Sequence, residues 1–293
     1  MEAIVLSFIG KTQEYLNECI YQIRLFSDKP IYYIYDDYEN ILVEHIYKKY
    51  DNIHLIKYEL VRSNDFDNIL KIKKSSFYIE YAIKDRKELF IRSFERFYLL
   101  YNLCILKNIE NVLFLELDNL IYDNPDIWFS QLTEKKLYYM MDNVDRCASG
   151  IFISRNNNYL KDLLISFDNY ILNDNGFLTE MTALYRFYQN NKETVYILPT
   201  HWDIKPYSDN FKDTIFDSSA MGIYLFGYHV MHTNGVLTKG SKNIYCFIDY
   251  TNYNFVWKII DNKKIPFINY EGKMIKINNL HIHAKNLIEA ISV

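Results

Sequence analysis

Short apolar segments alternate with amphipathic segments over the first 56 residues of the chain. Residues 3–8, 31–35 and 53–56 are brief apolar runs of the kind that form buried strands. Residues 12–26 and 40–50 lie between them and repeat apolar side chains at helical spacing, with Thr12 as the expected N-cap of the first helix. This strand–helix order predicts an α/β fold with a mostly parallel central sheet and helices on its faces.

The alternation continues through the middle of the chain. We expect helices over residues 88–107, 157–172 and 179–189, and strands over 111–115, 137–141, 151–154 and 195–198. Residues 62–88 are polar with weak periodicity, and we interpret them as an insertion. After about residue 200 the pattern predicts aromatic loops and short strands. No repeat or linker marks a boundary, so we expect one domain over residues 1–293.

Composition narrows the classes of partner and compartment. A 49% hydrophobic content supports a substantial core, and a net charge of −4 makes nucleic acid an unexpected partner. The four cysteines form no Cys-x-x-Cys pair, so we expect neither a zinc site nor a thioredoxin-like motif. We see no signal peptide and no apolar stretch of membrane-spanning length, so we expect a cytoplasmic protein without a transmembrane segment.

Two acidic residues follow the apolar run 111–115. Glu116 and Asp118 fall at the carboxyl end of a buried strand, which is where open α/β sheets bind ligands. Their carboxylates need a partner there, and carboxylate oxygens suit Mg²⁺ or Mn²⁺. An isolated pair of this kind more often marks a turn, so its interpretation depends on the other polar segments.

Five further features accompany the acidic pair in a defined order along the chain. They are Phe8-Ile9-Gly10 after the first strand, Asp36-Asp37 after the second, Arg96 on the helix before the pair, and the two late segments Phe216–Gly222 and His281-Ile282-His283-Ala284-Lys285. With these features in this order, most of the chain resembles nucleotide-sugar-dependent glycosyltransferases of the GT-A fold. Glu116-Leu117-Asp118 resembles the Asp-x-Asp metal motif of that family, with Glu at its first position.

The resemblance implies a Rossmann-like fold with a nucleotide-binding half over about residues 1–120 and an acceptor half over about 121–293. It implies transfer of a sugar from a nucleotide sugar, in the first instance a UDP-sugar, to a hydroxyl group. The acceptor is a glycan, a protein or a small molecule, and the cofactor is Mn²⁺ or Mg²⁺. Aromatic-rich surfaces are also compatible with a homo-oligomer.

The resemblance also implies roles for particular residues. The expected metal ligands are Asp118, Glu116, His283 and His281, with His283 preferred over His281. The expected donor contacts are Phe8, Ile9, Gly10, Asp36, Asp37, Arg96, Glu116 and Lys285. If the tail is a strand, Asn279, His281, His283 and Lys285 share one face, from which Lys285 reaches a phosphate. For Asp36 and Asp37, a strand-end turn is as good an interpretation as contact with the donor. For Arg96, an ordinary surface position is as good an interpretation.

A direct displacement needs a carboxylate base near the acceptor hydroxyl. Asp217, in a loop of small residues, is our first candidate, and Glu180 is the second, although Glu180 also suits the first turn of a helix. Trp202 and Asp203 are the expected acceptor contacts, while a buried core Trp is equally consistent. Residues 147–150 either let a sugar approach the backbone or begin a buried strand.

Two rival functions stay open. One is a nucleotide- or sugar-binding module without catalysis. It is consistent with Glu116 in place of the first Asp of the metal motif and with the lack of a single clear catalytic base. A sugar-1-phosphate nucleotidylyltransferase is less favoured, because it needs a glycine-rich basic loop after the first strand. At that place this chain has Gly10-Lys11-Thr12-Gln13, with a single glycine.

Overall fold

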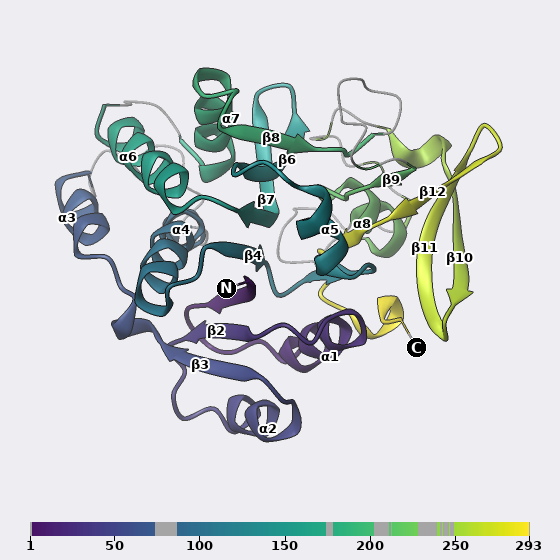
Figure 1. Cartoon of the computed structure of the whole chain (residues 1–293), viewed down its shortest axis with the longest axis horizontal. Helices are drawn as coiled ribbons and strands as arrows, with labels where there is room; N and C mark the ends of the chain where they lie inside the picture. Colours follow the sequence, from purple (N-terminus) through teal and green to yellow (C-terminus); the bar gives the residue numbers. More distant parts are fainter. Residues whose placement is uncertain are drawn as a thin grey trace.

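The computed structural model describes residues 2–73, 87–173, 178–201, 211, 213–227, 239–240, 242, 246 and 249–292. Within these residues, a seven-stranded central sheet lies between two layers of helices, and a smaller four-stranded sheet packs at one end (Figure 1).

The central sheet has the strand order β3-β2-β1-β4-β7-β6-β8. Its strands are β1 (Glu2–Phe8), β2 (Ile31–Tyr35), β3 (Ile53–Lys57), β4 (Asn111–Leu115), β6 (Leu137–Asn143), β7 (Arg146–Ser154) and β8 (Val195–Leu198). The first four are mutually parallel, β7 runs antiparallel to both of its neighbours, and β6 is parallel to β8. The predicted α/β fold with a mostly parallel central sheet flanked by helices is confirmed.

Alternating side chains bury the sheet on both faces. In β1, Ile4 and Leu6 pack toward α1 (Leu16–Phe26), α2 (Ile41–Lys49) and α5 (Pro125–Gln131). Ala3 and Val5 point to the opposite layer, which is formed by α3 (Asn64–Lys73), α4 (Lys87–Lys107), α6 (Asn157–Asn173) and α7 (Glu180–Asn190). Each large aliphatic side chain buried in this way contributes about 1.5–3 kcal/mol, so the two helical layers hold the sheet rigidly.

The last third of the chain builds the smaller sheet, in the order β10-β11-β12-β9. Its strands are β9 (Thr214–Ile215), β10 (Asn254–Ile260), β11 (Lys263–Tyr270) and β12 (Lys273–Ile277). The short helices are α8 (Ala220–Phe226) and the 3₁₀ turns η1 (Tyr58–Leu60), η5 (Tyr250–Asn252) and η6 (Ile288–Ala290). These elements surround one more strand pair, which matters most for the site.

That pair joins the tail of the chain to the segment after β4. Strand β13 (Asn279–His281) runs antiparallel to β5 (Asn119–Ile121), with His281 opposite Asn119. The backbone N–H of Ile282 donates to the Asp118 carbonyl at 2.7 Å, so the connection continues past the end of β13. Two segments that lie some 160 residues apart in the sequence therefore run side by side.

The predicted starts of two elements, α1 and β7, were wrong, and the predicted insertion contains a helix. Helix α1 begins at Leu16 with Tyr15 at its N-cap position, so Thr12 does not cap the helix, and the Thr12 N–H donates to the Asp37 carboxylate at 2.8 Å. Part of the polar stretch 62–88 is helix α3, which is held by the buried side chains of Phe66 and Ile69. Strand β7 begins at Arg146 and not at 151, so residues 147–150 begin a buried strand.

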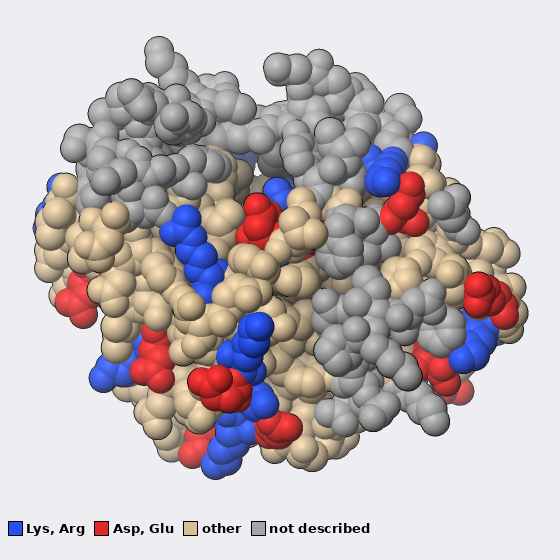
Figure 2. Space-filling model, turned by 90° about the horizontal axis from the view of Figure 1, so that it is seen from above, with Lys and Arg blue, Asp and Glu red and all other residues tan. Residues whose placement is uncertain are grey.

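The surface agrees with a modest net charge. On the face shown in Figure 2, acidic and basic side chains of the described residues are interspersed and neither sign forms a continuous field. Within the described part of the chain, no helix combines the length and hydrophobicity that a membrane crossing requires.

Candidate metal and donor site

The acidic pair lies at the carboxyl end of β4, beside the end of β1. The backbone N–H of Glu116 donates to the Gly150 carbonyl of β7 at 3.1 Å, and the Asn119 N–H then donates to the Glu116 carbonyl at 3.0 Å. These two bonds turn the chain sharply between β4 and β5. The turn places Asp118 in the interior, with only 4% of its surface exposed. A carboxylate at such a depth needs compensating charge.

One imidazole meets both carboxylates. The Nε2 atom of His281 lies 3.0 Å from Oε2 of Glu116 and 3.4 Å from Oδ1 of Asp118. One ligand atom from each of the three side chains falls within 4.8 Å of the other two. Two carboxylate oxygens and one imidazole nitrogen form a donor set that fits Mn²⁺ or Mg²⁺, with Mn²⁺ the better match because imidazole suits the softer ion.

Two permanent cations flank the cluster. Lys285 Nζ pairs with Oδ2 of Asp118, which leaves Oδ1 toward His281. Arg96, on α4, pairs with Glu116 and donates to the Ser149 hydroxyl at 2.6 Å and to Glu180 at 3.2 Å. Arg96 is therefore a buried bridge between strands and helices, not the surface guanidinium that the sequence left open.

The neighbouring charges shift the pKa values of Asp118, Glu116 and His281. Burial alone would raise the pKa of Asp118, but Lys285 and His281 bring it well below its usual range. Burial likewise opposes ionisation of Glu116, and Arg96 with His281 lowers its pKa. Burial would lower the pKa of His281, yet the two carboxylates raise it to about 10. Without a metal, the site thus holds two carboxylates and an imidazolium.

His283 stands behind His281, outside the carboxylate cluster. The two imidazole rings have centroids 4.2 Å apart and are tilted by 32°. Burial and the neighbouring His281 charge lower the pKa of His283, so this second ring is neutral. Strand β13 ends at His281, and Lys285 has φ +62 after a turn, so the predicted shared face of His281, His283 and Lys285 along one strand was wrong.

The predicted nucleoside loop is tied to the end of β2. The Gly10 N–H donates to Asp36 at 2.7 Å, and Asp37 accepts from the Thr12 N–H and from the Asn40 side chain at 2.8 Å each. The Thr12 N–H lowers the pKa of Asp37 more than any other contact does. Both acids therefore shape the loop. Gly10 has φ +111, and its exposed backbone leaves room for a ligand to approach.

Phe8 and Ile9 precede Gly10 at the end of β1 and are half-buried. Their backbone lies in the loop that Asp36 and Asp37 hold, so the predicted donor contacts Phe8, Ile9, Gly10, Asp36 and Asp37 form one continuous surface.

The two candidate bases occupy different surroundings. Glu180 opens α7 behind a Thr179 capping box and pairs with Arg96, and burial raises its pKa even though Arg96 partly opposes the shift. Asp217 has no exposed surface and receives four backbone N–H groups. Because an acceptor hydroxyl cannot reach a carboxylate so enclosed, we keep only Glu180 as a proposed base. Trp202 and Asp203 lie outside the described residues.

Two glycines at the site have a packing role that the sequence did not assign to them. A Cβ on Gly150 would lie 2.6 Å from Nδ2 of Asn119 and 3.1 Å from Nδ1 of His281. A Cβ on Gly222 would lie 2.0 Å from the His281 carbonyl oxygen. A glycine inside the apolar strand run around 150 was the available signal, since glycine in a strand often marks close approach of another group.

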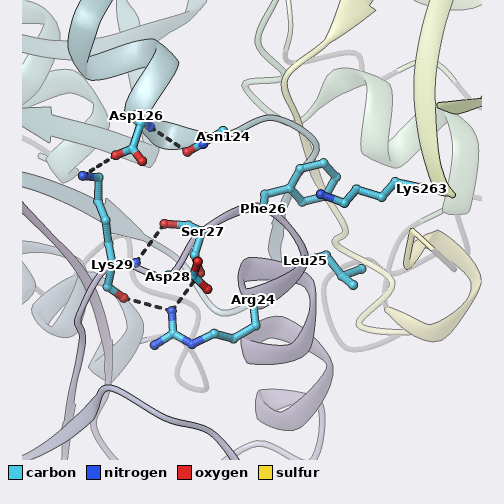
Figure 3. Close-up of a pocket in the computed structure, with 9 residues that line it drawn as sticks. All are labelled: Arg24, Leu25, Phe26, Ser27, Asp28, Lys29, Asn124, Asp126 and Lys263. Carbon is cyan, nitrogen blue, oxygen red and sulfur yellow. Dashed lines mark hydrogen bonds and ion pairs between the residues drawn. The ribbon is translucent and has the colours of Figure 1, made fainter. Parts of the chain in front are cut away.

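A cavity of about 450 Å³ lies elsewhere, at the C-terminal end of α1 (Figure 3). It is lined by Arg24, Leu25, Phe26, Ser27, Asp28, Lys29, Asn124, Asp126 and Lys263. Arg24 already donates to four backbone carbonyls, and Lys29 pairs with Glu2 and Asp126. None of the predicted site residues lines it, so this cavity is not part of the candidate site.

Comparison with protein-family models finds no match, and comparison with curated proteins finds none either. Solved structures do resemble this one. Mouse xyloside xylosyltransferase 1 without ligand aligns at 10% identity and TM-score 0.47, over 69% of this chain and 87% of that one. The galactosyltransferase LgtC with donor and acceptor sugar analogues aligns at 13% and 0.47, over 68% and 73%. GlyE of Streptococcus pneumoniae TIGR4, a glycosyltransferase, aligns at 12% and 0.43, over 68% and 46%.

These similar structures are glycosyltransferases, as the resemblance in the sequence led us to expect. At such low identities and TM-scores, the activities and substrates of those proteins do not transfer to this chain.

Proposed function

We propose that this chain is a metal-dependent glycosyltransferase that takes its sugar from a nucleotide sugar. The observation that carries the proposal is the meeting of Glu116, Asp118 and His281 at the carboxyl end of β4, with the cations Arg96 and Lys285 beside them. A diphosphate ester needs this combination, because its leaving group gains negative charge as the sugar departs.

The residues that would hold the ion are Asp118, Glu116 and His281. When bound, a divalent cation neutralises charge on the leaving diphosphate. Lys285 contributes a point charge at the same place, because its ammonium already lies against Asp118. Arg96 acts from the other side by fixing the orientation of Glu116, which leaves its second oxygen toward His281.

We assign the nucleoside to the loop that contains Phe8, Ile9 and Gly10, with UDP-sugars as the first donors to test. Its support is the exposed Gly10 backbone at the carboxyl end of β1, where open α/β sheets bind nucleotides. We assign acceptance of the acceptor proton to Glu180, because burial has moved its pKa upward toward the range of an effective base. The acceptor is a hydroxyl group of a glycan, a protein or a small molecule.

A panel of UDP-sugars with Mn²⁺, read by anomer-sensitive NMR, tests the function. We expect slow hydrolysis of one donor without acceptor, and loss of that turnover with EDTA. A thermal shift with UDP and Mn²⁺ but no turnover would instead identify a binding module. Release of pyrophosphate from UTP and a sugar 1-phosphate would identify a nucleotidylyltransferase.

Metal affinity should increase with pH. The metal-free site protonates His281, whose pKa is raised to about 10, and a metal binds only the neutral imidazole. Binding thus releases one proton throughout the range below pH 10, and the apparent association constant should rise about tenfold per pH unit. Isothermal titration with Mg²⁺ in buffers of different ionisation enthalpy, between pH 6.5 and 8.5, measures both quantities. A flat affinity with no proton release would contradict the proposed His281 ligand.

A further inference from the structure

We propose that Asp217 and Gly222 are positioning residues that hold His281 against the acidic pair. The proposal rests on the proposed function, since His281 is a ligand of the same metal. It gives a role to the buried Asp217 carboxylate, which no acceptor can reach, and to a glycine that the chemistry does not use. Three sets of contacts support it.

The first is the hydrogen bonding of Asp217. Its Oδ1 atom accepts the backbone N–H groups of Ser219 and Met221, both at 2.9 Å. Its Oδ2 atom accepts those of Gly222 at 2.8 Å and His281 at 3.0 Å. Three of these donors belong to the start of α8 and the fourth belongs to β13. One charged acceptor therefore joins the loop at α8 to the backbone of the proposed ligand.

The second is the space at Gly222. An added Cβ would lie 2.0 Å from the carbonyl oxygen of His281 and 2.7 Å from its carbonyl carbon. Both are backbone atoms, so no side-chain rotation relieves the contact. Helix α8 thus approaches β13 as closely as a glycine allows, and any larger residue would displace His281.

The third is a side-chain bridge through Asn279, which is fully buried. Its Oδ1 atom accepts the Asp217 N–H at 2.9 Å, and its Nδ2 donates to the Asp217 carbonyl at 2.9 Å and to Oδ1 of Asn119 at 2.8 Å. The loop at 217, strand β13 and strand β5 therefore form one hydrogen-bonded unit. Because β5 follows Asp118 directly, the unit fixes His281 relative to the acidic pair.

Metal ligands must be held within about 0.5 Å of their productive positions, and loss of an orienting contact typically costs 10–100-fold in metal affinity. We therefore expect Asp217→Asn to weaken Mn²⁺ binding about 10–100-fold by electron paramagnetic resonance titration. The matched control is Asp249→Asn, which removes a carboxylate that caps the η5 turn through the Thr251 N–H. This control should leave Mn²⁺ affinity unchanged.

A double-mutant cycle separates positioning from general damage. If Asp217 acts through His281, then Asp217→Asn in a His281→Ala background should change the remaining Mn²⁺ affinity less than about twofold. An equal loss in both backgrounds, or a folded Asp217→Asn protein with wild-type affinity, would overturn the proposal. Should that variant not fold, Asn279→Ala removes the bridge, keeps the carboxylate and undergoes the same cycle.

A readout without metal separates this proposal from the proposed function. Labelling with ¹⁵N-histidine gives seven backbone amide signals, and His281→Ala identifies the one from His281. Asp217→Asn should move that signal upfield in the metal-free protein, because the amide loses a charged acceptor. An unmoved signal would refute positioning. Absence of Mn²⁺ binding to the wild-type protein, with the signal moved, would refute the metal site alone.

Discussion

Replacing Asp118 with asparagine is expected to abolish saturable Mn²⁺ binding at millimolar concentration and to lower donor turnover about 10²–10³-fold. The substitution keeps the volume of the side chain but removes the charge that faces both His281 and Lys285. With one carboxylate left, the site no longer offers two anionic oxygens to a divalent ion. Paramagnetic resonance titration and donor hydrolysis measure the two effects.

The control for this substitution is Asp123→Asn. Asp123 lies five residues along the chain and pairs with Lys276 at 2.7 Å with 14% of its side chain exposed, so its loss removes an ion pair of comparable depth. We expect wild-type Mn²⁺ affinity in that variant. Retention of Mn²⁺-dependent turnover in Asp118→Asn would show that this carboxylate is no ligand.

Replacing Arg96 with methionine is expected to lower the free energy of unfolding by about 3–5 kcal/mol. Arg96 is 13% exposed and lies between the half-buried Glu116 and the buried Glu180, so its removal leaves both carboxylates without their shared cation. Methionine fills much of the space of the arginine stem. The decrease in the free energy of unfolding should therefore come mainly from the lost charge and not from a cavity. Urea denaturation followed by circular dichroism measures the change.

Two further variants separate the effect of the lost charge from that of the lost hydrogen bonds. Arg96→Lys keeps the charge but not the fork that reaches Glu116, Ser149 and Glu180 together, so its loss should be smaller. Arg24→Met removes a guanidinium that donates to four backbone carbonyls of the described residues, so it tests loss of arginine hydrogen bonds to the main chain. A change below about 1 kcal/mol in Arg96→Met would show that the two acids find other compensation.

Local periodicity located the first four strands of the central sheet but not the start of β7. Strands β1 to β4 and helix α4 lie within about two residues of their predicted ranges, because a buried strand or amphipathic helix shows its period in adjacent residues. Helix α3 was missed since Phe66 and Ile69 are its two buried anchors among polar neighbours. Thr12 was misassigned because it belongs to a loop before α1, where its backbone N–H donates to Asp37 in the segment that follows β2.

The candidate site was predictable in part. The family resemblance brought the acidic pair and the tail histidines together, and the structure shows how: β13 pairs with β5. No local pattern reveals that register, so the sequence could not show that the strand ends at His281 and leaves His283 behind it. Likewise, an aspartate before small residues suggested an exposed base. Only the fold shows that four backbone N–H groups enclose Asp217.

Anomalous diffraction from crystals soaked in Mn²⁺ and UDP is the most direct measurement of the central claim. We expect a manganese peak among Oδ1 of Asp118, Oε2 of Glu116 and Nε2 of His281, at distances of about 2.0–2.6 Å, with the diphosphate completing its coordination. A fully soaked crystal with no peak between these three atoms, or with manganese bound only elsewhere, would contradict the account.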